Sequence, residues 1–343
     1  YYEQYKAEQK YSSYGLKNPM VNGIGVTKTD LIRQLWLDNL YYGTNFSFQM
    51  KDENREIILA GGNSQYDGNH FGKIIWAQAG IFKDHRWYDL DAQKSEQHVF
   101  GKWMEKLGSF HLFGDLQLRN VNYEIEGFRN NPTLSIDKNW LFINPKAGLR
   151  YTSGAYSSFI SYALANKEPN RDDFEAGTTD IPKHETLHDV EAGIERTGSK
   201  LKIAATVYHM RYNNQLVLTG KINDVGAYTR TNIPLSYRTG LEIEATLSIS
   251  DRLHINNNLA LSSNKVKNHR EFYDDYDAGD QKVDFFSTSN IAFSPAVVDN
   301  ATISYTLLKD LETRLISKYV SRQYLDNTSR KDRSIDRRIK GQI

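Results

Sequence analysis

Apolar and polar residues alternate at every second position in several stretches of the chain. In residues 241–249, every odd-numbered position is apolar and every even-numbered position is polar. The same alternation runs through residues 110–119, 201–208 and 253–262. Successive side chains of a β-strand point to opposite faces, whereas a helix needs repeats of three and four. These segments are therefore predicted to be strands with one apolar and one polar face.

The connections between the predicted strands alternate between short and long. Short turns are expected near residues 107–109, 152–154, 198–199 and 250–251, and long polar loops at roughly residues 121–138, 165–184, 213–235 and 264–281. Short turns at one rim and long loops at the other are typical of bacterial outer-membrane barrels. Strand alternation alone also fits a soluble antiparallel sandwich with half-buried sheets. The connection lengths favour an all-β fold, an antiparallel transmembrane β-barrel with long extracellular loops and short periplasmic turns.

One stretch tests this rhythm, because residues 282–293 and 299–308 are separated by Ser294 and Pro295. A single bent strand restores the order of short and long connections, and proline, which lacks an N–H for the ladder, explains the bend. A turn at 309–310 and a strand over about 311–321 should follow. The count is about 13 strands, after an irregular start over residues 1–40.

Composition narrows the partners of the chain. Lys and Arg total 43 and Asp and Glu total 42, which gives no reason to expect nucleic acid as a partner. The absence of cysteine excludes disulfides and cysteine metal sites. No apolar stretch is long enough to predict a transmembrane helix. The low mean hydropathy of −0.63 still fits a barrel, because only alternate residues of each strand touch lipid.

The two ends of the chain give further expectations. Residues 1–3 show no basic region followed by an apolar core, so residue 1 is expected to be internal to a longer precursor. Residues 330–343 are rich in Arg and Lys and have no apolar face. We expect residues 1–336 to form the barrel portion and residues 337–343 to be an aberrant or truncated basic tail.

Residues 165–174, Ala-Asn-Lys-Glu-Pro-Asn-Arg-Asp-Asp-Phe, resemble a segment of TonB-dependent receptors of the Bacteroidetes type, where a strand enters an extracellular loop. Further matches to this family follow in order along the chain, at residues 1–5, 29–33, 36–39, 66–72, 115–119, 236–242, 318–320 and 323–328. The resemblance thus extends from residue 1 to about residue 336.

This resemblance implies a barrel of about 22 strands filled by an N-terminal plug. It implies a receptor in the Gram-negative outer membrane that contacts outer-membrane lipid. Such a receptor imports a scarce ligand, such as an iron chelate, cobalamin or a glycan, with energy from the TonB complex. Here the plug has no counterpart, so contact with the TonB complex would depend on a plug domain absent from this chain. The usual final strand with its terminal aromatic is also missing, so the barrel is expected to be partial. We expect no enzymatic activity and no cofactor.

Two outer-loop segments are candidates for ligand binding. One combines aromatic and polar groups, which suits a binding surface, and the other carries an arginine that can donate two hydrogen bonds to a carboxylate. The alternatives are a solvated turn for the first and a loop brace for the second. The candidate residues are Tyr66, Asp67, His70, Glu168, Asn170, Arg171, Asp172 and Asp173.

Alternation also predicts which polar side chains face the lumen. A Lys or Arg facing lipid at mid-membrane costs ~2–4 kcal/mol, so charged residues of the strands should point inward. The predicted lumen residues are His111, Asp115, Gln117, Arg119, Lys202, Glu242, Glu244, His254, Glu312 and Arg314.

Three other motifs point to different chemistry. Residues 184–188 match the H-E-x-x-H pattern of zinc peptidases, which needs both histidines on one helix face. A strand is expected here, and it would separate the two histidines by ~13 Å, too far for one zinc ion. The acidic residues of 274–280 lack an EF-hand register and are expected in a solvated loop. Residues 327–329 match a glycosylation acceptor. A soluble glycan-binding β-sandwich and a passive porin remain alternatives, and a zinc peptidase is disfavoured.

Overall fold

The computed structural model describes residues 2–129, 131–176, 181–222, 228–275, 277 and 280–342. In this part of the chain no helix is long and apolar enough to cross a membrane. The elements, in chain order, are β1 Tyr2–Lys10, η1 Tyr11–Tyr14, β2 Met20–Val21, β3 Ile24–Gly25, β4 Lys28–Lys51, β5 Arg55–Ala77, β6 His85–Leu107, β7 Phe110–Phe128, β8 Asn131–Ser153, β9 Tyr156–Lys167, α1 Arg171–Ala176, β10 Glu185–Thr197, β11 Leu201–Ile222, β12 Tyr228–Ser250, β13 Leu253–Asp275, β14 Asp280–Asn290, β15 Val297–Leu308, β16 Leu311–Val320, β17 Gln323–Tyr324, η2 Lys331–Arg333, β18 Ser334–Ile335 and β19 Arg338–Gln342.

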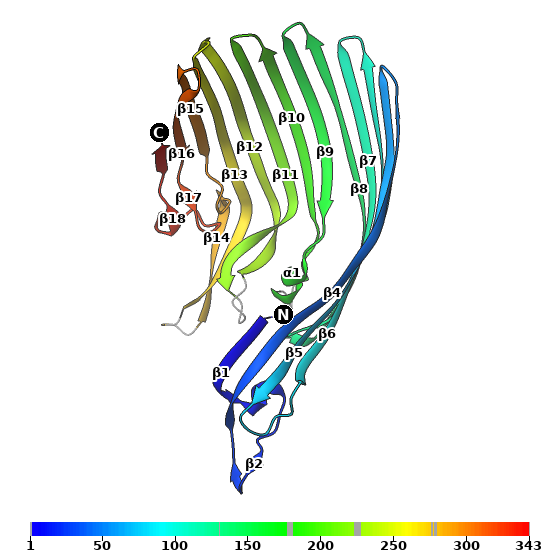
Figure 1. Ribbon diagram of the computed structural model, residues 1–343, viewed down its shortest axis with the longest axis vertical. Helices are drawn as coiled ribbons and strands as arrows, with labels where there is room; N and C mark the ends of the chain where they lie inside the picture. Colours follow the sequence, from blue (N-terminus) through cyan, green and yellow to red (C-terminus); the bar gives the residue numbers. More distant parts are fainter. Residues whose placement is uncertain are drawn as a thin grey trace. The chain divides into compact units, whose positions relative to one another are not determined.

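Most strands join one 15-stranded sheet in which neighbours in sequence are neighbours in space (Figure 1). The order runs from β1 through β4 to β13, then through β15 and β16 to β19, with β14 beside β13. The all-β antiparallel prediction is therefore confirmed. Within the described residues β1 and β19 do not pair with each other. The sheet holds more strands than the count from alternation because β1 and β19 lie in stretches without a clear period of two.

The first and last residues of the chain are more regular than the sequence predicted. Residues 28–51 form one strand, β4, where an irregular start was expected. Residues 338–342 form β19, which pairs with β16 from Ile316 opposite Gln342 to Val320 opposite Arg338. The predicted basic tail thus completes a ladder of backbone hydrogen bonds, which depends little on side-chain type.

The predicted long loops are also largely strand. Strands β11 and β12 extend to residues 222 and 228, through most of the stretch 213–235 that was expected to be a loop. Their ladder still pairs Leu218 with Arg230. Leu216, Val217 and Leu218 are consecutive apolar residues, so the period of two is lost there while backbone pairing continues. By contrast, the predicted short turns are confirmed, and Gly108 and Gly154 adopt positive φ values of 60° and 56° in two of them.

The stretch around Pro295 occupies one place in the strand order, beside β13, but it consists of two strands, β14 and β15. Strand β14 pairs with β13 from Lys265 to Asp275, and β15 pairs with the same strand from Leu253 to Leu261. Residues 291–296 interrupt the ladder between them. The predicted order of short and long connections therefore holds, and the predicted continuous strand does not.

The chain divides into two compact units, each considered by itself. Unit 1 comprises Tyr1–Phe46, Gly61–Val99 and Arg119–Leu141, and unit 2 comprises Ser47–Ala60, Phe100–Leu118 and Phe142–Ile343. In unit 1, β1 pairs with β4, and η1 packs Tyr14 against the buried side chains of Leu31 and Ile74.

The sheet of unit 2 has one apolar and one polar face. Residues directly opposite each other on neighbouring strands share a face. One such row of partners across β8 to β15 consists only of apolar residues: Leu149, Ile160, Ala192, Val207, Leu241, Leu261 and Val297. The next residue along each of β8 to β13 belongs to the other face, where the row contains Arg150, Phe159, Gly193, Thr206, Glu242 and Ala260.

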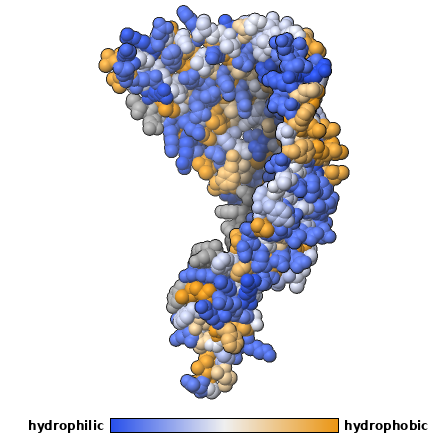
Figure 2. All heavy atoms as spheres, turned by 45° about the vertical axis from the view of Figure 1, so that its right-hand side comes forward, coloured by the Kyte–Doolittle hydropathy of each residue, from blue (hydrophilic) through white to orange (hydrophobic). Residues whose placement is uncertain are grey.

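The apolar face of unit 2 is not covered by a second layer. Val207 is 53% exposed, and Leu241, Ile243 and Leu247 are not buried. Figure 2 shows an apolar patch between two hydrophilic zones on the right of the visible surface. The alternative of a soluble sandwich, which requires these side chains between two packed sheets, is therefore wrong.

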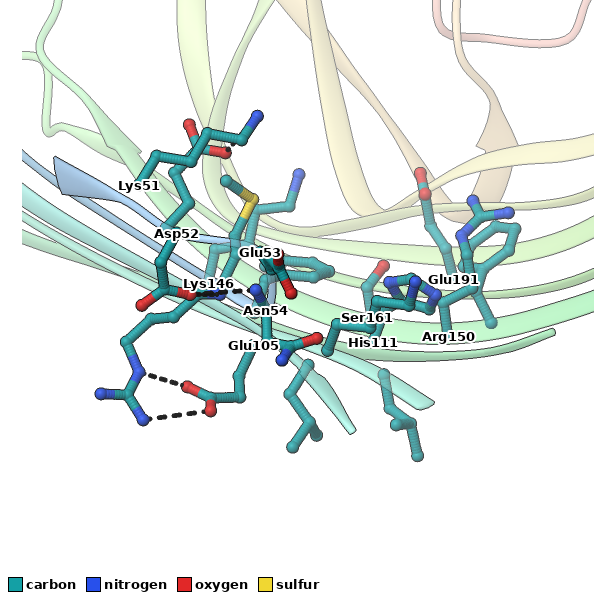
Figure 3. A pocket seen from close by; sticks show the side chains of 18 residues that line it. Lys51, Asp52, Glu53, Asn54, Glu105, His111, Lys146, Arg150, Ser161 and Glu191 are labelled. Carbon is teal, nitrogen blue, oxygen red and sulfur yellow. Dashed lines mark hydrogen bonds and ion pairs between the residues drawn. The ribbon is translucent and has the colours of Figure 1, made fainter. Parts of the chain in front are cut away.

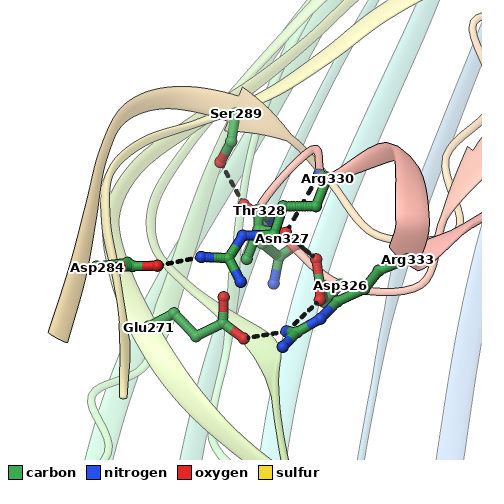
Figure 4. Close-up of polar contacts among 8 residues, drawn as sticks. All are labelled: Glu271, Asp284, Ser289, Asp326, Asn327, Thr328, Arg330 and Arg333. Atoms are coloured by element: carbon green, nitrogen blue, oxygen red, sulfur yellow. Dashed lines mark hydrogen bonds and ion pairs between the residues drawn. The ribbon is translucent and has the colours of Figure 1, made fainter. Parts of the chain in front are cut away.

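The segment after β16, residues 321–337, folds back onto β13 and β14 through a set of polar contacts that we call the clasp (Figure 4). Arg333 Nη1 donates to Glu271 Oε1 at 2.7 Å and to Asp326 Oδ2 at 3.0 Å. Arg330 pairs with Asp284. Both arginines therefore connect this segment to carboxylates that β13, β14 or the segment itself supplies.

A buried asparagine lies at the centre of the clasp. Asn327 is 1% exposed, its Oδ1 accepts the backbone N–H of Ala292 at 2.9 Å, and its carbonyl oxygen accepts the hydroxyl of Ser289. The glycosylation pattern at 327–329 is thus used for internal hydrogen bonding in the folded chain. Burial raises the pKa of the Asp326 carboxyl, but hydrogen bonds from Thr328 and Arg333 outweigh burial and leave this pKa below its usual value.

Asp326→Asn should loosen the clasp, because it removes the charge that Arg333 and Thr328 stabilise. A hydrogen bond to a charged group is worth about 2 kcal/mol, so amides of residues 323–335 should exchange roughly thirtyfold faster. Hydrogen exchange of the full-length protein checks this. The matched control is Asp336→Asn, whose partner Arg322 lies at 2.6 Å in an exposed pair worth less than about 1 kcal/mol. Equal exchange in the two variants would contradict the role of the clasp.

The clasp should also weaken in acid. The pKa of Asp326 in the folded chain lies below the unfolded value of about 3.9, so its contribution is complete above that value. The contribution is lost as the pH falls through the folded pKa. Exchange protection of residues 323–335, corrected for intrinsic rates, should therefore fall as the pH drops below about 4 in the wild type and stay flat in Asp326→Asn. The same pH dependence in both proteins would assign it to another group.

Candidate functional site

Three of the predicted ligand-binding residues lie in unit 1, on strand β5 rather than in a loop. The Tyr66 hydroxyl donates to Asn39 Oδ1 at 2.8 Å and lies 3.3 Å from His70 Nε2. Asp67 lies between them in sequence, so it points to the opposite face and accepts from Gln65 Nε2 at 2.9 Å. Tyr66 and His70 are brought together, and Asp67 is separated from them.

Asp67 lines an acidic groove of about 510 Å³ in unit 1. The other carboxylates of this groove are Asp38, Asp91, Glu124 and Glu126, and no Lys or Arg is among its lining residues. Such a surface attracts cationic groups and repels anions. The sequence motif at residues 66–70 predicted only Asp67 of this set, because the other carboxylates come from β4, β6 and β7 and meet only through strand pairing.

The second predicted segment, residues 168–173, lies in unit 2, where it follows β9 and forms the first turn of α1. Asp173 is 3% exposed, and it accepts from Arg230 Nε at 2.6 Å and Arg230 Nη2 at 2.7 Å. The backbone N–H of Asn170 also donates to Asp173 Oδ2 at 2.8 Å, and the backbone N–H of Asp173 donates to Asn170 Oδ1 at 3.1 Å. These contacts fasten α1 to β12, which is the predicted alternative of a loop brace for Asp173.

The remaining residues of this segment differ in exposure. Glu168 is buried, Arg171 is half-buried, and Asn170 and Asp172 are exposed. Asp172 and the exposed part of Asn170 are therefore available to a ligand, while Asp173 holds the loop through Arg230 and the backbone of Asn170. The predicted residues of unit 1 and unit 2 form separate groups, each of which is held by its own strands.

A polar-walled cavity of about 590 Å³ lies on the polar face of unit 2 (Figure 3). Its wall includes His111 of β7, Lys146 and Arg150 of β8, Ser161 of β9 and Glu191 of β10. Ser161 lies directly opposite Glu191 in the ladder, so both point to the same side. With both signs of charge and a histidine, this cavity can hydrogen-bond a polar ligand or a packed protein segment.

The β4–β5 turn closes one side of this cavity. Asp52 accepts the backbone N–H groups of Asn54 at 2.9 Å and Arg55 at 2.8 Å, and these two hydrogen bonds lower the pKa of its carboxyl. Arg55 Nε donates to Glu105 Oε2 at 2.6 Å and its Nη2 to Glu105 Oε1 at 3.1 Å. The turn is thereby fixed to β6 in a single geometry.

Of these wall residues, only His111 was predicted from the sequence. Lys146, Arg150 and Glu191 were missed. Arg150 and Glu191 each follow an apolar residue, Leu149 and Val190, whose side chain points to the other face of the sheet. Alternation assigns the face of such residues, but not which of them converge across several strands. The sequence could therefore predict that these residues share the polar face. It could not predict that they line one cavity.

The other predicted lumen residues can be located from the strand pairing. In unit 2 the ladders place Lys202, Glu242, Glu244, His254 and Arg314 on the polar face. Glu312 pairs with Arg314, and Gln117 accepts from Asn144 Nδ2 at 2.9 Å. Asp115 lines a shallow depression at the apolar side. In unit 1, Arg119 donates to Glu96 Oε2 at 2.8 Å.

The zinc-peptidase pattern lies at the start of a strand, as expected from Pro182. Glu185 begins β10 and accepts the backbone N–H of Leu216 at 2.5 Å. His188 Nδ1 bonds with the Tyr162 hydroxyl at 2.9 Å. Within the described residues no group of three or more His, Asp or Glu is arranged to hold a metal ion. The acidic stretch 274–280 lies partly outside the described residues, so its solvated loop stays a prediction.

Comparisons with known proteins agree with this architecture. Residues 1–338 match the family described as TonB dependent receptor-like, beta-barrel. A sequence comparison with curated proteins gave no match. Among solved structures, the chain is similar to the copper transporter OprC, with a TM-score of 0.69 and 14% identity over 91% of this chain and 48% of that protein.

Two other similar structures are a ferric citrate transporter and a siderophore receptor. The unliganded ferric citrate transporter FecA gives a TM-score of 0.63 at 12% identity, over 92% of this chain and 47% of that protein. The siderophore receptor PiuA from Acinetobacter baumannii gives 0.61 at 13% identity, over 92% and 49%. The chain thus spans about half the length of these proteins. With the family match along residues 1–338 and a sheet that is apolar on one face and polar on the other, this chain belongs to the TonB-dependent receptor-like β-barrel family.

Proposed function

We propose that this chain supplies wall strands and outer segments of an outer-membrane receptor that imports a scarce ligand with energy from the TonB complex. The observation that carries the proposal is the two-sided single sheet of unit 2 together with the family match. Hydrocarbon accepts only the apolar face, and a water-filled lumen accepts the polar face. The narrower resemblance to the Bacteroidetes type and the absence of a plug stay predictions.

The ligand is proposed to be a metal chelate, among the classes of iron chelate, cobalamin and glycan that the sequence suggests. The support is that similar structures include transporters named for copper, ferric citrate and siderophores. Chelates carry oxygen and nitrogen groups that side chains such as those of Asn170 and Asp172 can hydrogen-bond. Binding is proposed at these exposed loop residues, and at Tyr66, Asp67 and His70 of the other unit.

Two adjacent alanines of β11 test the sidedness on which this function rests. Ala205 pairs with Ile243 on the apolar face, and Ala204 pairs with Glu244 on the polar face. Ala205→Lys should cost ~2–4 kcal/mol of folding free energy in a bilayer, since it places a charge in hydrocarbon. Ala204→Lys adds the same side chain near a carboxylate and should change stability little.

The measurement is the urea dependence of folding of the full-length receptor in phospholipid vesicles. A larger loss for Ala204→Lys than for Ala205→Lys would assign the faces the other way round and remove the support for a membrane wall. Equal small losses would show that neither face meets hydrocarbon.

Uptake of a radiolabelled ferric chelate tests the function itself. Cells that carry the full-length receptor should take up ferric citrate or a ferric catecholate only when their TonB complex is intact. Asp172→Ala should raise the half-saturating concentration roughly fivefold, because one lost hydrogen bond is worth about 1 kcal/mol. The amount of receptor in the outer membrane should stay unchanged.

The control for this experiment is Asp173→Asn, which should weaken the brace to Arg230 and reduce the amount of folded receptor rather than ligand affinity alone. Uptake that continues without the TonB complex would favour a passive porin. Uptake of neither chelate, with TonB-dependent uptake of cobalamin or a glycan, would retain the receptor and replace the proposed ligand class.

A further inference from the structure

The apolar face of unit 2 ends in a belt of basic and aromatic side chains. The strand ladders place Leu164, His188, Arg211, Tyr237, Lys265 and Asn290 opposite one another in one row across β9 to β14. The neighbouring rows on the same face add Tyr162, His209 and Lys267. We call Arg211, Lys265 and Lys267, together with the neighbouring His188 and His209, the cationic belt.

The belt lies on the same face as the apolar band. Pairing between β10, β11, β12 and β13 is uninterrupted from Val207 and Leu241 to Arg211 and Tyr237, so alternation assigns these residues to one side. Beyond the belt, the ladders are disturbed at Asn214 and Asn268, which adopt φ values of 55° and 52°. The regular wall therefore carries the belt at its last rows.

The height of the belt matches one boundary of a membrane. Arg211 follows the first residue of β11, Leu201, by ten positions, which corresponds to ~33 Å of strand. At a tilt of about 40° this is roughly 25 Å of barrel height, the thickness of the apolar band of outer-membrane barrels. The short turns mark the periplasmic rim in such barrels, so the belt lies at the boundary with the outer leaflet.

No carboxylate balances the belt. The three rows that contain it include neither Asp nor Glu from β9 to β14. Lys265 donates to Asn290 Oδ1 at 2.6 Å and Lys267 to Thr288 Oγ1 at 2.7 Å, which are neutral acceptors. The polar face of the same strands differs, because it carries acidic residues beside its basic ones. These acidic residues are Asp189, Glu191, Glu195, Glu242 and Glu244.

Aromatic rings hold the belt in place. Lys267 Nζ lies 5.9 Å from the ring centre of Tyr237, and the ring of His209 lies 6.2 Å from the same ring. His188 bonds with the Tyr162 hydroxyl at 2.9 Å. Tyr is the residue that prefers the interface between hydrocarbon and headgroups. Fixed cations beside interfacial tyrosines offer a surface for anionic groups that lie at this depth.

We propose that the cationic belt binds the phosphate groups of anionic lipids in the outer leaflet. The occupant follows from charge complementarity and from continuity with the lipid-facing band, because a group at this height must be attached to a lipid embedded beside Val207 and Leu241. Arg211 donates to phosphate oxygens with its planar guanidinium, and Lys265 and Lys267 add point charges. The inference rests on the proposed membrane location and adds a lipid partner to it.

The test compares full-length receptor variants in detergent micelles that contain lipid A, either intact or with its phosphates removed. Arg211→Gln combined with Lys265→Gln should lower the affinity for intact lipid A on the order of tenfold, since each basic side chain near an anionic surface adds severalfold. The affinity for the dephosphorylated lipid should not change. Added salt should weaken binding of intact lipid A to the wild type more than to the variant.

The matched control neutralises two cations of the polar face, Lys202→Gln with Lys318→Gln, and should leave both affinities unchanged. An equal loss of affinity for intact lipid A in the control would assign the effect to net charge and overturn the proposal. A belt variant that binds intact lipid A as tightly as the wild type would also overturn it. Failure of the proposed function is distinguishable, because it would appear as a wild-type receptor that does not fold into vesicles at all. If the belt variant misfolds, Lys267→Gln alone should still lower the affinity for intact lipid A severalfold.

Discussion

The structure depends on the pairing of backbone N–H and C=O groups between neighbouring strands in a single layer. Hydrocarbon offers no hydrogen-bond partner, so each strand must satisfy its backbone with its two neighbours. Where the sheet of unit 2 is a single uncovered layer, each side chain lies on one of two faces with different surroundings. The row from Leu149 to Val297 and the row from Arg150 to Ala260 are the direct consequence, since they differ by one residue along each strand.

This constraint explains which features the sequence could predict. Alternation survives wherever one face must be apolar, so strands such as 201–208 and 241–249 and the short turns between them were predictable. It is lost in the outer halves of β11 and β12, where apolar residues such as Leu216, Val217 and Leu218 follow one another directly although strand pairing continues to Leu218 and Arg230. Strands β1 and β19 were missed because their sequences also lack a clear period of two, although the backbone ladder forms.

The candidate site was less predictable than the fold because its residues converge from separate strands. The motif at 168–173 identified a functional-looking loop, but burial divides it into a buried pair, Glu168 and Asp173, and an exposed pair, Asn170 and Asp172. The cavity around Arg150 and Glu191 required the strand register, which no local pattern contains. The belt has the same origin, since its basic residues are far apart in sequence and adjacent only through the ladders.

The interruption at residues 291–296 has a consequence for how the receptor can vary between relatives. Strand β13 pairs Lys265 with Asn290 above the break and Leu261 with Val297 below it, so the two ladders are aligned independently. An insertion or deletion in the β13–β14 hairpin need not shift the pairing of β15 with β13. The β13–β14 hairpin can therefore change in length and sequence while the rest of the sheet keeps its register.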